Sequence, residues 1–437
     1  MIKNAQFTNR NLAELLQVLS LFALSVFLII PNAVISITLV VFSLSSLFLT
    51  FNNKVNKSIV LLQIGFYVLL LMSIFFSVNK FAGFGELKGN ITLFFFPLLL
   101  LFFDNRFLNK AYKFIILLYV LANLGLVVIL FNFFSNGIVF DRFPNLIEEG
   151  VLAQLEYLWS YPFEFILSKS LKGGSSWFIN HKTILALNFL LACLFSLKLF
   201  FVDFNSSKYR ILLITPIIIL VPAIVYTQSL INIALLPLLV IFVLLYLQKK
   251  LHKISFVILI SIAVGITFFN SDLKKTFNNG NSTSVVNLYY SLRNGEINLD
   301  ADPRSFIYYC DLILIRNRPF FGYGIGDVQD QLSNCYDSNN FKAKHKQDRI
   351  FNSHNFYAHL MLAGGLLPLI MFLWMFWFNS KISFTRKDYA YLFFLIIFSI
   401  NLLLDNVILR FQGSLCFAFF NSLFLWKNLN NVTWKKQ

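Results

Sequence analysis

The chain has 437 residues, of which 58% are hydrophobic, only 13% are charged and 54 are Phe. Apolar runs of roughly 17–25 residues recur along most of the sequence, and about 20 such residues cross a bilayer as one helix. This composition excludes an ordinary soluble domain and predicts an all-α, polytopic membrane protein. The first apolar run shows no small-residue cleavage site, so we take it as the first span and expect no cleavable signal peptide.

We predict about twelve transmembrane helices, most of them separated by short polar clusters. The fourth contains Lys88, so its continuously apolar part is only Ile91–Phe103. The predicted spans are Leu15–Ile30, Ala33–Phe51, Ser58–Val78, Gly85–Phe103, Ala111–Phe134, Thr183–Phe201, Ile211–Tyr226, Leu230–Leu247, Ile254–Phe269, Phe356–Phe378, Tyr389–Leu404 and Gly413–Trp426.

The net charge of +16 would suggest nucleic acid as a partner for a soluble protein. With both termini placed in the cytoplasm, basic residues far outnumber acidic ones on the inner segments. On the outer segments the two signs are nearly balanced. This is the positive-inside pattern, which sets the orientation and makes nucleic-acid binding unnecessary.

The predicted spans divide the chain into five parts. Residues 1–134 hold the first five helices, and residues 183–269 hold the next four. Residues 356–437 hold the last three helices and a cytoplasmic tail. Between these parts lie two outer segments, residues 135–182 and the large periplasmic loop 270–355, which joins spans nine and ten.

Both outer segments contain local patterns that predict helices. In the first, apolar residues recur every four positions from Ile147 to Trp159, which predicts an amphipathic helix. It lies either on the membrane surface or against the rest of the segment. In the second, Asp302 as N-cap and Pro303 at the first helical position predict a helix that runs to about Arg316.

The second of these helices carries candidate binding residues. Arg304, Tyr308 and Asp311 share one face by the i, i+4, i+7 rule. Arg304 offers a permanent forked donor for phosphate oxygens, although a cation that snorkels to lipid headgroups would look the same in the sequence. Arg318, close to the helix end, is a further candidate for binding the substrate.

His354 and Asn355 stand where the chain re-enters the membrane at the tenth span. A neutral imidazole there can take a proton from a sugar hydroxyl, and an Asn side chain can hold a sugar ring or an amide. A capping or interfacial histidine is the structural alternative. His359 is expected on a different face of the helix. Gly364-Gly365, which falls within the predicted span, indicates close helix packing.

The Pro319–Gly326 stretch contains three glycines and is able to form a backbone nest for an anion. Other polar residues gather at the outer ends of predicted spans, where ionisable groups are functional candidates by default. They are His181, Lys182, the Tyr226–Ser229 turn, Asp405, Asn406, Arg410 and Gln412. With Arg304 and His354 they would form a polar cup on one face of the membrane.

Metal and cysteine chemistry receive less support. Asp300-Ala-Asp302 has the D-x-D pattern, but hard-cation sites normally assemble more oxygen ligands, so we predict no metal and no other cofactor. Cys310 and Cys335 both lie in the large outer loop, where a disulfide is permitted, and their spacing leaves the paired and free states open. Cys193 and Cys416 lie within spans and are expected to be packing residues.

Several of these motifs together resemble the O-antigen ligase / O-antigen polymerase superfamily. They are Arg304-x-x-x-Tyr308, Pro319-x-x-Gly322-x-Gly324, and His354-Asn355 followed by Gly365. The resemblance extends over about residues 175–425, where His181-Lys182-Thr183 and the Asp405–Phe417 stretch look like further family landmarks. Two positions depart from the family pattern, because Leu230 stands where an Arg is frequent and Pro368 where a Gly is common.

The resemblance implies a C-type glycosyltransferase fold that is independent of metal. It also implies transfer of a glycan from an undecaprenyl-diphosphate carrier to an acceptor hydroxyl at the periplasmic face of the bacterial inner membrane. By this resemblance Arg304 binds the diphosphate and His354 acts in catalysis. Lys182 or Arg410 would replace the arginine missing at Leu230.

The expected function is therefore an inverting lipid-linked-glycan transferase embedded in the lipid bilayer. The acceptor is the lipid A core in an O-antigen ligase, or another repeat unit of glycan in a polymerase, and the sequence does not choose between them. A polysaccharide flippase or transporter is the rival from another class. Such a protein needs polar residues near mid-bilayer in related halves, whereas here they gather at the outer surface.

Overall fold

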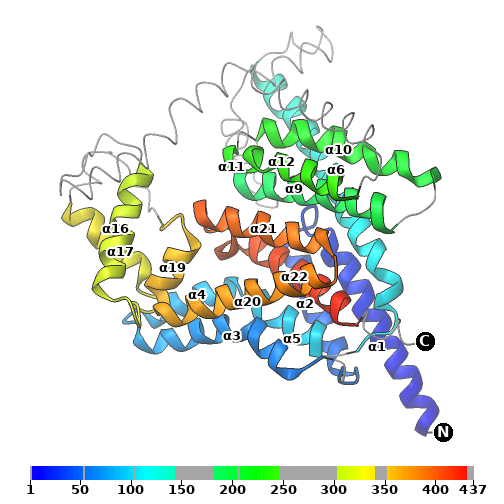
Figure 1. Ribbon diagram of the computed structural model, residues 1–437, viewed down its shortest axis with the longest axis horizontal. Helices are drawn as coiled ribbons and strands as arrows, with labels where there is room; N and C mark the ends of the chain where they lie inside the picture. Colours follow the sequence, from blue (N-terminus) through cyan, green and yellow to red (C-terminus); the bar gives the residue numbers. More distant parts are fainter. Residues whose placement is uncertain are drawn as a thin grey trace. The chain divides into compact units, whose positions relative to one another are not determined.

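The computed structural model describes residues 2–52, 55–102, 104–142, 181–203, 207–227, 229–246, 303–339 and 352–430 (Figure 1). Every regular element in these ranges is a helix or a single helical turn. The chain divides into two compact units: Met1–Phe51 with Phe103–Thr267, and Asn52–Phe102 with Phe268–Gln437. The predicted ninth span, the amphipathic helix at 147–159 and the D-x-D motif lie outside the described residues.

Helices of the first unit pack around α9, whose side chains are nearly all buried. Asn188 of α9 accepts a hydrogen bond from the Tyr119 hydroxyl of α6 at 2.6 Å, which satisfies a polar group inside an apolar bundle. The described elements of this unit are α1 (Ile2–Ser25), α2 (Asn32–Leu47), α6 (Leu108–Arg142), α9 (Lys182–Lys198), the π-helical turn η3 (Leu199–Asp203), α10 (Ser207–Tyr226), α11 (Leu230–Ala234) and α12 (Leu236–Tyr246).

The second unit contains the Arg304–Gly365 stretch. Its helix α20 packs on α3 and α21, α22 packs on α5, and α16 packs on α17 and α19. Its described elements are α3 (Lys57–Ser73), η1 (Ile74–Phe76), α4 (Lys80–Gly89), α5 (Thr92–Phe102), α16 (Pro303–Asn317), α17 (Val328–Ser338), α19 (Phe356–Gly364), α20 (Leu366–Thr385), α21 (Tyr389–Leu404), η4 (Val407–Leu409) and α22 (Phe411–Asn430).

A buried amide network ties four helices of this second unit together. Gln63 of α3 and Asn379 of α20 exchange two hydrogen bonds of 2.8 and 3.0 Å. Asn421 of α22 bonds to both of them, and the Tyr391 hydroxyl of α21 donates to Asn421 at 2.8 Å. Within an apolar bundle, satisfied polar groups of this kind fix the register of neighbouring helices.

Four described helices are long and apolar enough to cross a membrane. They are Lys57–Phe76, Leu108–Leu130, Lys182–Asp203 and Leu366–Thr385, and the bent pair α4–α5 would add a fifth. The structure therefore supports an all-α membrane protein. The total of about twelve spans, and the place of the large loop between the ninth and tenth, stay predictions.

The predicted fourth and tenth spans are interrupted in the structure. The predicted fourth span, Gly85–Phe103, is wrong as a single helix, because α4 ends at Gly89 and α5 begins at Thr92 with a bend of 47° between them. The continuously apolar part, Ile91–Phe103, corresponds closely to α5. The predicted tenth span breaks at Gly365, whose φ of 74° ends α19 before α20 begins.

Other boundaries agree more closely with the sequence. Tyr389–Leu404 is both the predicted eleventh span and α21. The fifth predicted span continues past Phe134, because α6 runs to Arg142. Pro368, the departure from the family pattern, falls in the first turn of α20, where a backbone N–H has no partner within the helix and proline costs little.

Candidate active site

Arg304 lies in the first turn of α16, which begins at Pro303 as predicted and ends at Asn317, shortly before Pro319. Its side chain is half-buried. On the same face of α16, Tyr308 is half-buried and Asp311 is fully buried. Because α16 packs against α17 and α19, the arginine is presented on a helix held from two sides.

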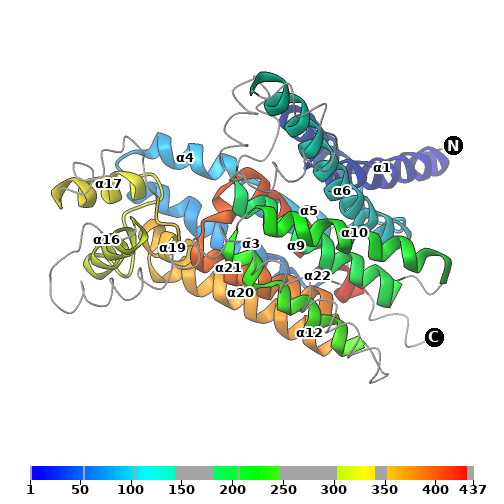
Figure 2. The same ribbon diagram turned by 90° about the horizontal axis from the view of Figure 1, so that it is seen from above.

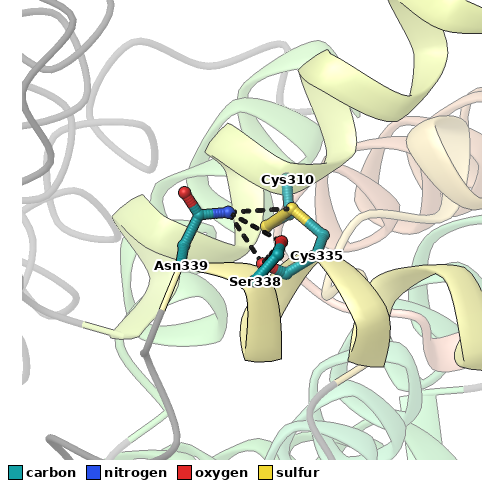
Figure 3. The surroundings of a disulfide bond; sticks show 4 residues. All are labelled: Cys310, Cys335, Ser338 and Asn339. Carbon is teal, nitrogen blue, oxygen red and sulfur yellow. Dashed lines mark hydrogen bonds between the residues drawn. A yellow bond between two sulfur atoms is a disulfide. The ribbon is translucent and has the colours of Figure 1, made fainter.

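A disulfide between Cys310 and Cys335 joins α16 to α17 (Figure 3). The two Cα atoms are 6.0 Å apart, within the ordinary range for this bond. Asn339 closes the end of α17 by donating to the carbonyl oxygen of Cys335 at 2.8 Å. The spacing of the two cysteines leaves the paired and free states open, and the structure shows the paired state.

Asp311 connects α16 to the segment that carries His354. The Ser353 hydroxyl lies 2.9 Å from Asp311 Oδ2 and 2.9 Å from the carbonyl oxygen of Asn355. The second carboxyl oxygen, Asp311 Oδ1, has no hydrogen-bond partner within the described parts of the chain. Burial raises the pKa of Asp311 well above its usual range, although the hydrogen bond from Ser353 opposes this shift.

The backbone turns sharply at His354 before entering α19. His354 adopts a φ of 50°, which is uncommon for a residue other than glycine. Asn355 is the N-cap of α19, and its side-chain oxygen accepts hydrogen bonds from the N–H groups of Tyr357 and Ala358. Because that oxygen already accepts these hydrogen bonds, only the side-chain NH2 group of Asn355 is left for the predicted role in holding substrate.

His354 Nδ1 lies 3.9 Å from Asp405 Oδ1. Asp405 follows the last residue of α21 and is buried, whereas the His354 side chain is 27% exposed. The distance exceeds a hydrogen bond but is within the range of an ion pair, and contacts in catalytic pairs are often long before substrate binds. A carboxylate beside one ring nitrogen orients an imidazole and stabilises its protonated form.

The glycine-rich stretch 319–326 does not form the predicted anion nest. Tyr323 and Gly324 donate their N–H groups to the carbonyls of Leu362 and Ala363, at the end of α19. Ile325 donates to the hydroxyl of Ser73, the last residue of α3, and Gly326 donates to the hydroxyl of Ser77, which follows η1. Gly322 and Asp327 also bond to backbone carbonyls. With these N–H groups committed to the protein, the loop serves to join α16, α19 and α3.

The other predicted cations lie in different surroundings. The Arg318 guanidinium sits 4.9 Å above the ring of Tyr323, where a cation–π contact engages it. Arg410 follows η4, an element that packs on α19, and is half-buried. His181 and Lys182 begin α9 in the first unit. Their part in the same site stays a prediction.

A second histidine–carboxylate pair lies on another side of α19. His359 is buried, and its Nε2 is 2.9 Å from Glu86 Oε1 of α4. His354 and His359 therefore face different elements, as expected from the sequence. No group of three His, Cys, Asp or Glu residues suited to a metal ion occurs in the described ranges.

Sequence reasoning missed two contacts of this region. The sequence predicts Asp405 in the last outer turn but names no partner for it. The available signal for its pairing is that this acid is predicted at the same membrane depth as His354. Asp311 had been placed on the Arg304 face, but nothing in the sequence connected it to Ser353. Both contacts join residues far apart in the chain, so helical periodicity carries no information about them.

Residues 215–373 match the family model described as O-antigen ligase. The matched range includes Arg304, His354 and the glycine-rich loop, and it ends before Asp405 and Arg410. A comparison with curated proteins finds no match.

Proposed function

Because residues 215–373 match the O-antigen ligase family model, we propose that the chain belongs to the O-antigen ligase / polymerase superfamily and transfers a glycan from an undecaprenyl-diphosphate carrier to an acceptor hydroxyl at the periplasmic face of the inner membrane. The observation that carries the proposal is the pairing of His354 with Asp405. Arg304 lies on α16 and Arg410 directly follows η4, and both of these elements pack on α19, the helix that begins after His354. This combination supplies a base and cations, which glycosyl transfer from a diphosphate requires.

The proposed reaction is a single inverting displacement. The acceptor oxygen attacks the anomeric carbon from the face opposite the diphosphate, and its proton passes to Nε2 of His354. The bond between the anomeric carbon and the diphosphate oxygen breaks, and the lipid diphosphate leaves as an anion that needs no strong acid. Asp405, whose Oδ1 lies 3.9 Å from Nδ1, orients the ring and stabilises the imidazolium that forms.

Arg304 is assigned to the departing diphosphate. Charge increases on that group as the bond breaks, and a fixed guanidinium stabilises it most where water is partly excluded. The helix position supports this role, because α16 is anchored to α17 by the disulfide and to the His354 segment by Asp311. Arg304 and His354 are thus linked through the chain by specific contacts.

The test is transfer by purified, reconstituted protein supplied with a lipid-linked glycan and an acceptor. His354→Asn should reduce turnover by about 10²-fold or more, the usual contribution of a general base. Asp405→Asn should lower turnover with little change in KM, since it acts on the base. His252→Asn, in a predicted cytoplasmic segment, is the matched control. Normal turnover in the His354 variant would reject the proposal.

A ligase and a polymerase are distinguished in cells that lack the protein. Loss of all attached glycan chains indicates a ligase, whereas one remaining repeat unit indicates a polymerase. A flippase would move the lipid-linked glycan but leave its diphosphate bond intact in the reconstituted assay. We favour the transferase, because the histidine–carboxylate pair serves bond exchange and a flippase has no need of it.

Transfer is proposed to be independent of divalent ions. Asp300→Ala should have a mild effect, and activity should persist in EDTA. Activity lost in EDTA and restored by a divalent cation would instead implicate Asp300 and Asp302.

A further inference from the structure

A group of exposed aromatic side chains lies where the end of α3 meets the α16–α17 connection. We call the five residues Phe75, Phe76, Phe81, Phe320 and Phe321 the aromatic ridge. Phe81 is 90% exposed, Phe75 77%, Phe320 and Phe321 65% each, and Phe76 64%. The rings of Phe76 and Phe321 lie 6.2 Å apart, which joins the two chain segments into one surface.

Hydrogen bonds hold these two segments together. The carboxylate of Asp327 accepts from the N–H groups of Val78 and Asn79 at 2.7 and 2.8 Å. Gly326 donates to the Ser77 hydroxyl at 3.0 Å. In Figures 1 and 2 the yellow connection between α16 and α17 reaches the blue start of α4, in agreement with these contacts. These hydrogen bonds therefore fix the positions of both chain segments that carry the aromatic ridge.

The ridge continues a candidate membrane span. The span Lys57–Phe76 ends on it, so Phe75 and Phe76 reach the edge of the hydrocarbon region. Beyond that point the chain turns into α4, which is bent by 47° from α5 and exposes Phe81 and Phe84. A short helix with exposed aromatic side chains at the end of a span is typical of a segment that lies in the membrane interface.

The charges around the ridge also fit a lipid surface. Lys80, Lys88, Arg316 and Arg318 are exposed in the same two segments. The partly exposed acid there, Glu86, is in contact with His359. Basic side chains that flank exposed Phe favour anionic headgroups above and acyl chains below, whereas a protein partner would not require cations along the edge.

We propose that the aromatic ridge is a membrane-docking surface: Phe75, Phe76, Phe81, Phe320 and Phe321 enter one leaflet at the headgroup–acyl boundary. In this proposal the glycine-rich loop 319–326 has a structural role in place of anion binding. Its committed N–H groups hold Phe320 and Phe321 beside the end of α3. Docking fixes the C-terminal end of α16, which lies next to Phe320 and Phe321, relative to the membrane surface.

Nitroxide labels at single introduced cysteines test the proposal in the full-length protein, reconstituted in vesicles of phosphatidylglycerol and phosphatidylethanolamine. Phe81→Cys and Phe321→Cys report on the ridge, and Asp330→Cys, at an exposed position of α17, is the matched control. The unsubstituted protein gives the background, since Cys193 and Cys416 are fully buried and the other two cysteines are paired. The measurement is collision of each label with oxygen, which concentrates in lipid, and with a water-soluble nickel chelate.

Labels at both ridge positions should collide more with oxygen than with the chelate, and the label at Asp330 should show the reverse. A ridge label that behaves like Asp330 would show that the surface faces water and would overturn the proposal. Low collision with both reagents would show that a protein, such as a second copy of this chain, covers the ridge, and would overturn it as well. The two ridge variants are measured separately. If one of them fails to fold, the label in the other still decides the question.

Discussion

The Asp311–Ser353 contact implies a particular placement of protons. A serine hydroxyl has one proton, yet Ser353 Oγ lies 2.9 Å from two acceptor oxygens, on Asp311 and on the Asn355 backbone. While Asp311 is ionised, the Ser353 hydroxyl donates either to Asp311 or to Asn355; a protonated Asp311 can itself donate to Ser353, which then donates to Asn355. Burial of Asp311 favours the same protonated state, because removing a carboxylate from water makes its charged form costly. Burial thus favours the neutral form of Asp311, whose contact with Ser353 ties α16 to the His354 turn.

This proton placement predicts a pH dependence of stability. The pKa of Asp311 is raised in the folded protein, so its stabilising contribution is complete below the unfolded value, near 3.8, and is lost as pH rises through the folded value. Asp311→Asn keeps a donor toward Ser353 and removes the titration. The variant should therefore gain in melting temperature relative to the unsubstituted protein as pH rises, measured in detergent. Asp330→Asn, at an exposed acid, should show no such gain, and a pH-independent difference at Asp311 would contradict the assignment.

The diphosphate site needs a cation in place of the arginine that is missing at Leu230. A lipid diphosphate carries at least two negative charges, so we expect Lys182 or Arg410 to assist Arg304. Replacing the responsible residue by Gln should lower turnover by at least about tenfold, which corresponds to roughly 1.4 kcal/mol of transition-state stabilisation. Arg304→Ala should cost at least as much.

Turnover should be measured for Lys182→Gln, Arg410→Gln and the double variant, each at normal expression. Arg386→Gln, in a predicted cytoplasmic loop, serves as the control. Near-normal transfer by the double variant would mean that other residues bind the phosphates.

Among the elements, the break between α19 and α20 depends on Gly365. Its φ of 74° lies in the region that favours glycine, and a Cβ there would overlap the backbone carbonyl of Phe320. Gly365→Ala should therefore destabilise the protein by about 1–3 kcal/mol, the usual cost of such strain. Gly85→Ala is the matched control, because open space surrounds that helical position, and a gain of about 0.5–1 kcal/mol is expected there. Equal melting temperatures for the two variants would contradict this account.

The sequence predicted elements well where local rules decide the outcome. Pro303 and the apolar run at Tyr389–Leu404 gave helices whose positions the structure confirms. Prediction from the sequence fails where tertiary contacts decide the structure. The sequence indicates that Gly365 packs within a span, whereas in the structure it separates α19 from α20. The anion nest was wrong for the same reason: the N–H groups that a nest requires are used by residues distant in sequence. The pairing of His354 with Asp405 also depends on such contacts.

At the scale of the whole molecule, two independent features bear on orientation. The positive-inside pattern predicts that the segment 270–355 lies outside the cytoplasm. The disulfide between Cys310 and Cys335 lies in that segment, and such bonds persist in oxidising compartments. Charge acts during membrane insertion and the disulfide forms after it, so agreement between them strengthens the proposal that Arg304 and His354 face the periplasm.

The orientation leads to a prediction that reporter fusions can check. A reporter placed after Asn279 should read as extracytoplasmic, because that position lies in the predicted outer segment 270–355, ahead of the two paired cysteines. One placed after Lys250 should read as cytoplasmic, since basic residues cluster there. A fusion after Arg386, in another predicted cytoplasmic segment, should agree with Lys250. The opposite pattern would place Arg304 and His354 in the cytosol, away from a periplasmic acceptor, and the proposed transfer at the outer face could not then be correct.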